Sequence, residues 1–72
     1  MSIEPSQTYI LDDIKILLRE AYKQSEKIKK NAFLKRAKDL ENQLVLTYKM
    51  QGNMELASKI PEAVKEYEDT LQ

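Results

Sequence analysis

Residues 25–38 read SEKIKKNAFLKRAK, and they decide whether the chain folds back on itself or continues as one helix. The residues before this stretch carry an apolar stripe at helical spacing that ends at Ile28. The next stripe begins at Phe33, five residues later, and five steps of about 100° rotate the apolar face by more than a third of a turn. Asn31 lies between the stripes and suits either a helix end or an N-cap. We therefore predict a turn around Asn31.

The alternative is one uninterrupted helix from Ser6 to Gln51, because neither proline nor glycine occurs between Pro5 and Gly52. Such a helix would be about 69 Å long and would need to associate as a coiled coil. The lysines at 27, 29 and 30 favour the turn, because cations stabilise the C-terminal end of a helix.

The second boundary is predicted at Gly52 and Asn53, a C-terminal glycine followed by an N-cap candidate. Pro61 would interrupt a helix that started immediately afterwards, at a cost of about 3 kcal/mol. With Ser58 as the N-cap, Pro61 instead falls in the first turn, where no backbone donor is needed. We therefore expect a short turn or a single helical turn at 53–57, before a third helix from about residue 59.

These boundaries predict an all-α fold, an antiparallel three-helix bundle with helices at approximately 8–30, 32–51 and 59–71. The whole chain, residues 1–72, forms a single domain, with residues 1–6 disordered. The spacing of apolar residues predicts a core made of Ile10, Ile14, Leu17, Ala21, Ile28, Phe33, Ala37, Leu40, Leu44, Tyr48, Ile60, Val64 and Tyr67.

The composition argues against catalysis, because the chain has no cysteine and no histidine. We expect no catalytic residues, no cofactor and no metal site. The longest uninterrupted apolar runs are three residues, far below the roughly 20 that span a bilayer. The N-terminal stretch MSIEPSQ lacks the basic and apolar regions of a secretory signal, and we predict a cytoplasmic protein.

Charge is distributed unevenly along a chain whose formal net charge is zero. Residues 23–38 contain seven basic and one acidic residue, whereas 39–72 contain three basic and seven acidic ones. A turn near Asn31 would gather the basic residues at one tip of the bundle, where they either stay solvated or bind nucleic acid or another anionic surface. This basic tip consists of Lys23, Lys27, Lys29, Lys30, Lys35, Arg36 and Lys38.

The acidic end of the third helix is interpreted as a solvated face. A basic partner, or the basic tip of a second copy, is the alternative.

The first two helices carry more apolar residues than one small core would use. A chain of 72 residues buries only roughly 60% of its unfolded surface, so help from a second chain is expected. We predict that the surplus residues contact a protein partner, most often a second copy in a homodimer or larger oligomer, with a foreign helix in a groove as the alternative. The predicted partner contacts are Leu11, Leu18, Tyr22, Val45 and Leu46.

Residues 44–64, LVLTYKMQGNMELASKIPEAV, resemble part of a tetratricopeptide repeat. Leu44, Tyr48, Gly52 and Ala57 stand at the spacing at which that family places packing residues across a helical hairpin. The chain departs from the family pattern at Glu41, Val45 and Pro61, and it contains one partial repeat.

In length and topology the chain is also similar to the microtubule-interacting and transport domain, a three-helix bundle. Either resemblance implies an adaptor whose helical grooves receive a partner peptide. Taken together, we predict a non-catalytic interaction or regulatory module that self-associates; binding of nucleic acid or an anionic surface through residues 23–38 is the alternative function.

Overall fold

The computed structural model describes the backbone of residues 5–72 and the side chains of residues 10–72. Three helices account for nearly all of it: α1 (Pro5–Lys23), α2 (Lys27–Met50) and α3 (Met54–Leu71). They pack against one another, so the predicted all-α three-helix bundle is confirmed. Of the segment 1–6 that was expected to be disordered, residues 1–4 lie outside the described part, and α1 begins at Pro5.

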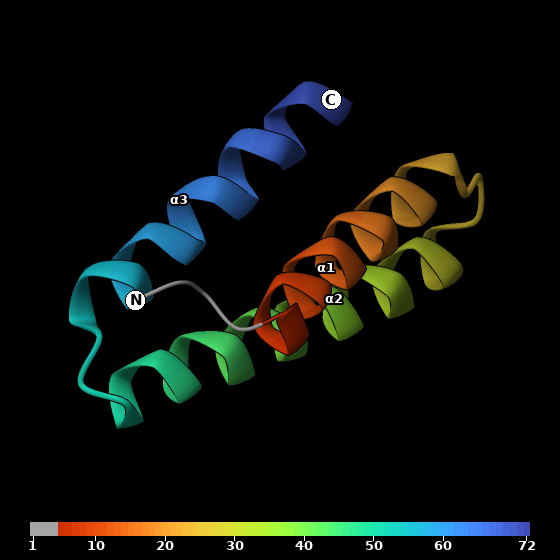
Figure 1. Cartoon of the computed structure of the whole chain (residues 1–72). Coiled ribbons are helices and arrows are strands. Elements are labelled where there is room, and N and C mark those ends of the chain that lie inside the picture. Colours follow the sequence, from red (N-terminus) through yellow and green to blue (C-terminus); the bar gives the residue numbers. More distant parts are fainter. Residues whose placement is uncertain (1–4) are drawn as a thin grey trace.

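The bundle is elongated, with principal extents of 41 × 19 × 19 Å. In Figure 1, α1 and α3 run in the same direction and α2 runs in the opposite one. The packing is most extensive between α1 and α2 and least extensive between α1 and α3. α2 is therefore the central helix, and α3 is held mainly by its contacts with α2.

The first turn lies at residues 24–26, so the prediction of a turn around Asn31 is wrong, although the chain does reverse direction. α2 runs without a break through Ile28 and Ala37. The end of α1 is satisfied by Gln24, whose amide donates to the Ala21 carbonyl at 3.1 Å and whose side chain donates to the Glu20 carbonyl at 3.3 Å. Extended backbone at residue 26 then starts α2.

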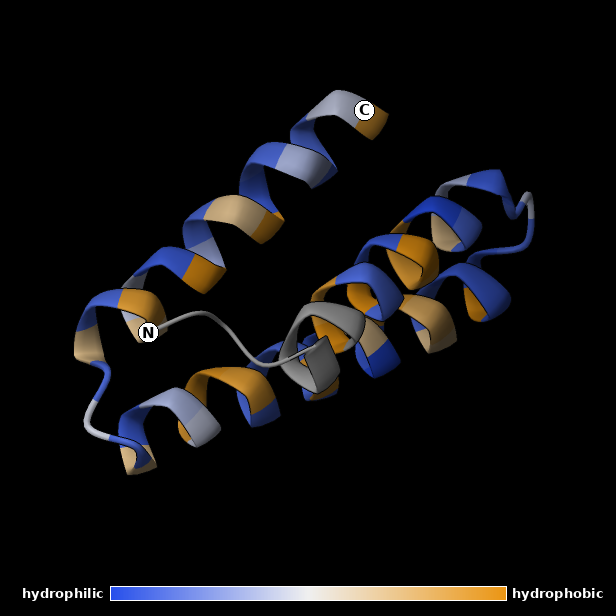
Figure 2. Ribbon diagram, viewed as in Figure 1, coloured by the Kyte–Doolittle hydropathy of each residue, from blue (hydrophilic) through white to orange (hydrophobic). Residues whose placement is uncertain are grey.

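The core contains Ile14 and Leu44 as its largest fully buried side chains, and Figure 2 shows the hydrophobic residues concentrated along the helix faces that meet. Most of the predicted core is confirmed. Two residues join the core that were not predicted there, Leu18 and Ala57. Among the side chains of residues 10–72, the buried hydrophobic residues are Ile14, Leu18, Ala21, Ala37, Leu44, Tyr48, Ala57, Ile60 and Val64.

Two predicted core residues lie elsewhere. Ile28 is 83% exposed, and its prediction as a core residue is wrong. Because Ile28 and Ala37 are nine residues apart on one continuous helix, they point to opposite faces of α2 at about 100° per residue. Phe33 is half-buried but lies outside the core cluster. Its apolar neighbours on α2 that do pack against the core are Leu34 and Leu40.

The second turn has the predicted Gly52 and Asn53. Residues 54–57 are helical but form the continuous start of α3, so the predicted short turn, the separate helix start near residue 59 and the Ser58 cap are wrong. Gly52 has a φ of 76°, which favours glycine. The Asn53 side chain accepts a hydrogen bond from the Leu56 amide at 3.2 Å and caps α3. Pro61 consequently lies inside the helix.

Among the described residues, no helix combines the length and the apolar content that crossing a lipid bilayer requires.

Candidate interaction surfaces

The five predicted partner contacts do not form one exposed surface. Leu18 is buried in the core, with 3% of its surface exposed, and its expected place on the surface is not observed. Leu11 and Val45 are partly buried and pack against the core cluster. Leu46, at 57% exposed, is the large apolar residue of this set that faces solvent. Leu11 and Leu18, which were predicted to lie on the surface of α1, therefore pack inside the three-helix bundle.

Tyr22, the fifth of these residues, links the end of α1 to the end of α3. Its hydroxyl donates a hydrogen bond of 2.7 Å to Glu68 Oε2 and accepts one of 3.2 Å from Gln72 Nε2. The Lys30 ammonium lies 4.4 Å from the centre of the Tyr22 ring, at cation–π distance. The hydrogen bond to Glu68, followed by desolvation, raises the pKa of Tyr22. Three helices therefore meet at this tyrosine.

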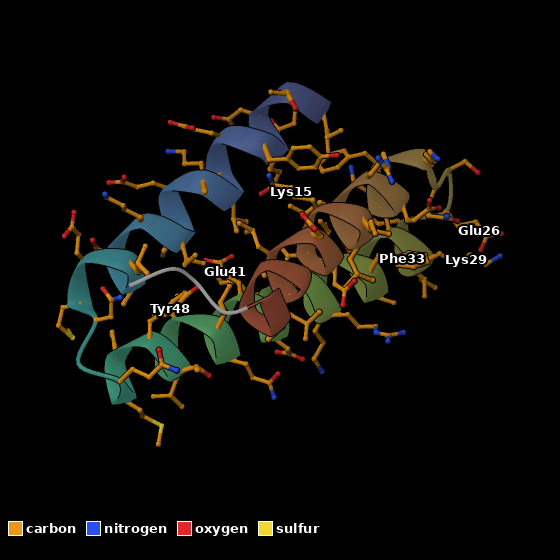
Figure 3. All side chains as sticks on the ribbon, viewed as in Figure 1. Lys15, Glu26, Lys29, Phe33, Glu41 and Tyr48 are labelled. Carbon is orange, nitrogen blue, oxygen red and sulfur yellow. The ribbon has the colours of Figure 1, made fainter. Side chains whose placement is uncertain are left out.

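The seven predicted basic-tip residues are only partly brought together. Lys23 and Lys27 flank the first turn, and Figure 3 shows Lys29 beside Glu26 at the same end of the bundle. Lys38 is eleven residues beyond Lys27 on α2, about 17 Å along the helix axis. The earlier position of the turn causes this spread, since it leaves the rest of the basic segment along α2.

Several of these cations already have acidic neighbours. Ion pairs join Lys23 to Glu20 at 3.5 Å and Lys29 to Glu26 at 4.0 Å. Both pairs are solvent-exposed and contribute at most about 1 kcal/mol each. Their effect is to neutralise part of the positive charge at the first turn.

A group of exposed apolar residues surrounds the second turn, and we call it the apolar end. It consists of Leu46, Met50 and Met54, which are 57%, 80% and 58% exposed. Leu46 and Met50 are four residues apart and share one face of α2. Met54 is the first residue of α3. Residues 46–54 contain one charged residue, Lys49, and the exposed Glu55 follows Met54 directly, so the apolar end is bordered by one cation and one anion.

A groove runs between α2 and α3, and we call it the α2–α3 groove. One part, of about 270 Å³, is lined by Leu18, Leu34, Ala37, Lys38, Glu41, Val64 and Glu68. An adjoining part, of about 460 Å³, is lined by Lys38, Glu41, Pro61, Val64, Lys65, Glu68, Asp69 and Gln72. The two parts share Lys38, Glu41, Val64 and Glu68, so apolar, acidic and basic side chains line the same space.

Glu41 is a charged residue of this groove that was not predicted to belong to a site. Its side chain is 9% exposed, and its one ion pair within the described side chains is with Lys38 Nζ, at 3.6 Å. Figure 3 shows Glu41 in the region between α2 and α3. The sequence signal was its register: it follows Ala37 by four residues and precedes Leu44 by three, so it occupies an apolar-face position.

The chain matches no protein-family model, no curated protein and no solved structure.

Proposed function

We propose that the chain is a small, non-catalytic protein–protein interaction module that associates with a second copy of itself through the apolar end. The observation that carries this proposal is the exposure of Met50, at 80%, beside Leu46 and Met54. Grouped apolar side chains on the surface of a small domain mark partner sites. A second copy fits this end because two identical apolar patches complement each other about a two-fold axis.

The expected affinity is low. Complete burial of a leucine or methionine side chain stabilises by about 1.5–3 kcal/mol, and these side chains are already partly covered. Six side chains from two copies therefore contribute on the order of 6–12 kcal/mol before the association cost, which is about 4–15 kcal/mol. Because these two contributions are of similar size, the complex is expected to be weak.

Sedimentation equilibrium between about 10 µM and 1 mM tests the proposal, because a weak complex forms only at high concentration. The wild-type chain is expected to associate, and Met50→Lys to remain monomeric, because the new charge would be desolvated in the contact. Ile28→Lys is the matched control, since Ile28 is equally exposed but lies at the other end of α2. A monomeric wild type at the highest concentration, or association that Met50→Lys leaves unchanged, contradicts self-association.

The peptide-binding adaptor role implied by the tetratricopeptide and microtubule-interacting resemblances belongs to the same class of function. Its support is local: Leu44 and Tyr48 of α2 and Ala57 of α3 are buried in the core, as the packing positions of a helical hairpin require. The α2–α3 groove supplies a place for a partner segment.

Binding to nucleic acid or another anionic surface is the second candidate. It is favoured by Lys27, Lys35 and Arg36, which are exposed and make no ion pair among the described residues. A gel-shift titration at low and moderate salt tests it, because each phosphate contact makes binding steeply salt-dependent. The absence of a shift at low salt would discard this function.

A further inference from the structure

We infer that the outer face of the first turns of α2 docks on an anionic phospholipid bilayer, with Ile28 inserted among the lipid headgroups. The inference rests on the second candidate function, binding to an anionic surface, and specifies which surface is bound. Its centre is Ile28, which at 83% is the most exposed large hydrophobic residue among the described side chains. We call this face the α2 basic face. Its exposed residues are Lys27, Ile28, Asn31, Ala32, Lys35 and Arg36.

The geometry of the helix places these residues on one side of α2. Lys35 follows Ile28 by seven residues, so the two side chains lie nearly in line, about 10 Å apart along the helix axis. Lys27 lies about 100° to one side of this line, and Arg36 lies about 80° to the other. Ala37, nine residues after Ile28, is buried on the opposite side of α2. Three cations therefore flank an exposed isoleucine on the side of α2 that faces away from the core.

The positive charge of the α2 basic face is not neutralised within the chain. Residues 27–38 contain six basic residues and no acidic one, and the acidic residues that bracket this segment are Glu26 and Asp39. The three cations of the face make no ion pair among the described residues. The carboxylates of α3 line the α2–α3 groove together with Glu41, and Glu41 lies about 140° around α2 from Ile28. The face therefore attracts an anionic surface.

The exposed isoleucine distinguishes a bilayer from a nucleic acid. The boundary between lipid headgroups and acyl chains, about 5–10 Å deep, accepts apolar side chains. A sugar–phosphate backbone attracts the same cations but gives Ile28 no apolar surroundings. Single strands are bound by stacking on aromatic side chains. The aromatic residue of this segment, Phe33, is half-buried and lies about 140° around α2 from Ile28.

The apolar end matches an anionic bilayer less well than the α2 basic face does. Leu46 lies on the same side of α2 as Ile28, but about 27 Å farther along the axis. The cation that borders the apolar end, Lys49, is balanced by the bordering anion Glu55. Electrostatic attraction therefore selects the α2 basic face. Because the two surfaces lie at opposite ends of α2, membrane contact leaves the apolar end free for a second copy.

Charge and apolar insertion both contribute to the expected affinity. Each lysine or arginine close to an anionic membrane strengthens binding about fivefold, so three cations give a preference for anionic over neutral lipid on the order of a hundredfold. Insertion of the isoleucine side chain adds about a further tenfold. Added salt weakens the first contribution, because the Debye length falls from about 10 Å at 0.1 M to about 3 Å at 1 M.

Co-sedimentation of the full chain with lipid vesicles measures this contact. One set of vesicles is phosphatidylcholine alone, and in the other roughly a third of the lipid is phosphatidylserine. The chain is expected to bind the anionic vesicles on the order of a hundredfold more tightly than the neutral ones, and salt should weaken this binding. Single-stranded and double-stranded oligonucleotides are titrated in the same buffer as the competing class of ligand.

Four substitutions at exposed positions separate the two contributions. Ile28→Gln is expected to weaken binding to anionic vesicles about tenfold, whereas Met50→Gln, at a residue that is 80% exposed, should change it by less than about twofold. Lys35→Gln is expected to weaken binding about fivefold. Its control is Lys59→Gln, because Lys59 pairs with Glu55 on α3.

Fluorescence reports the inserted residue directly, because the chain contains no tryptophan. Ile28→Trp introduces a single emitter at the centre of the α2 basic face. Its emission is expected to shift to shorter wavelength on anionic vesicles and to be quenched by brominated acyl chains. Met50→Trp is the matched control and should show neither change.

Three outcomes would overturn the inference alone. They are equal binding to neutral and anionic vesicles, equal losses for Ile28→Gln and Met50→Gln, and an unshifted emission from Ile28→Trp when vesicles are bound. Binding to an oligonucleotide without binding to anionic vesicles would also overturn it, while upholding the second candidate function with a nucleic acid as its ligand. Binding to neither class of ligand would contradict that function together with the inference.

Discussion

The Tyr22 hydroxyl donates a 2.7 Å hydrogen bond to Glu68 Oε2, and this bond joins residues 46 positions apart in the sequence. α1 and α3 share the least extensive helix–helix packing in the bundle. Tyr22→Phe removes the hydroxyl and leaves the ring in place over which Lys30 lies. We expect this substitution to lower the free energy of unfolding by about 1 kcal/mol, measured by urea denaturation at neutral pH.

Tyr67→Phe is the control for that measurement. The Tyr67 ring also lies beneath a lysine, with Lys15 Nζ 5.7 Å from its centre, but the hydroxyl makes no hydrogen bond among the described side chains. Its loss should therefore change the free energy of unfolding by less than about 0.5 kcal/mol. Equal effects of the two substitutions would show that the Tyr22–Glu68 bond adds nothing specific.

The same bond predicts a pH dependence of stability. Its acceptor, the Glu68 carboxylate, is the largest cause of the raised pKa of Tyr22, and desolvation is the second. Because the pKa of Tyr22 is higher in the folded chain than the unfolded value of 10.0, the protonated hydroxyl contributes its full stabilisation below about pH 10. This contribution is lost as the pH rises through the pKa of the folded chain. The stability difference between wild type and Tyr22→Phe should therefore be constant from pH 7 to 9 and shrink above about pH 10.

Urea denaturation of both proteins between about pH 7 and 11 measures this difference, because effects of pH that are common to both proteins cancel in the comparison. A difference that grows with pH would contradict the direction of the Tyr22 shift.

The number of helices was predictable because each has apolar residues at helical spacing and Gly52 marks the second turn, whereas the place of the first turn was not. Residues 24–26 contain neither glycine nor proline, and Glu26 caps α2 without a side-chain hydrogen bond. The turn therefore lacks glycine and proline, the residues that mark a turn most strongly, and Ser25 is its one residue of a usual turn type. In the sequence, Ile28 continues the first apolar stripe seven residues beyond Ala21. In the structure, however, Ile28 is exposed and faces away from the core.

The groove was harder to predict, because it depends on how α3 lies against α2. Leu18 and Val64 meet there from sequence positions 46 residues apart, and no local periodicity encodes that distance. The position of Glu41 within the apolar stripe was visible in the sequence. The structural role of Glu41 could not be predicted, because a polar residue within an apolar stripe either marks a helix boundary or lines a buried polar site.

Pro61 is a residue whose replacement should stabilise the protein. It lies at the eighth position of α3, where its nitrogen cannot donate to the carbonyl four residues earlier. Pro61→Ala restores a donor toward Ala57 and removes a penalty of about 3 kcal/mol, offset by about 1 kcal/mol because the unfolded chain gains freedom. We expect the free energy of unfolding to rise by about 2 kcal/mol in urea denaturation.

The neighbouring Glu62→Ala, also at an exposed position, is the control and should change stability by less than about 0.5 kcal/mol. A loss of stability in Pro61→Ala would mean that contacts made by the proline ring outweigh the missing hydrogen bond.

The position of the first turn can be tested with two isoleucines. Ile14 is fully buried in α1, whereas Ile28 is 83% exposed at the start of α2. Isoleucine-to-valine substitution removes one methylene from either residue, and any change in helix propensity is common to both. We expect Ile14→Val to cost about 0.5–1.5 kcal/mol, because it leaves a cavity, and Ile28→Val to cost less than about 0.5 kcal/mol. Had the turn been at Asn31, with Ile28 in the core, both substitutions would cost the same, and urea denaturation of the pair distinguishes the two arrangements.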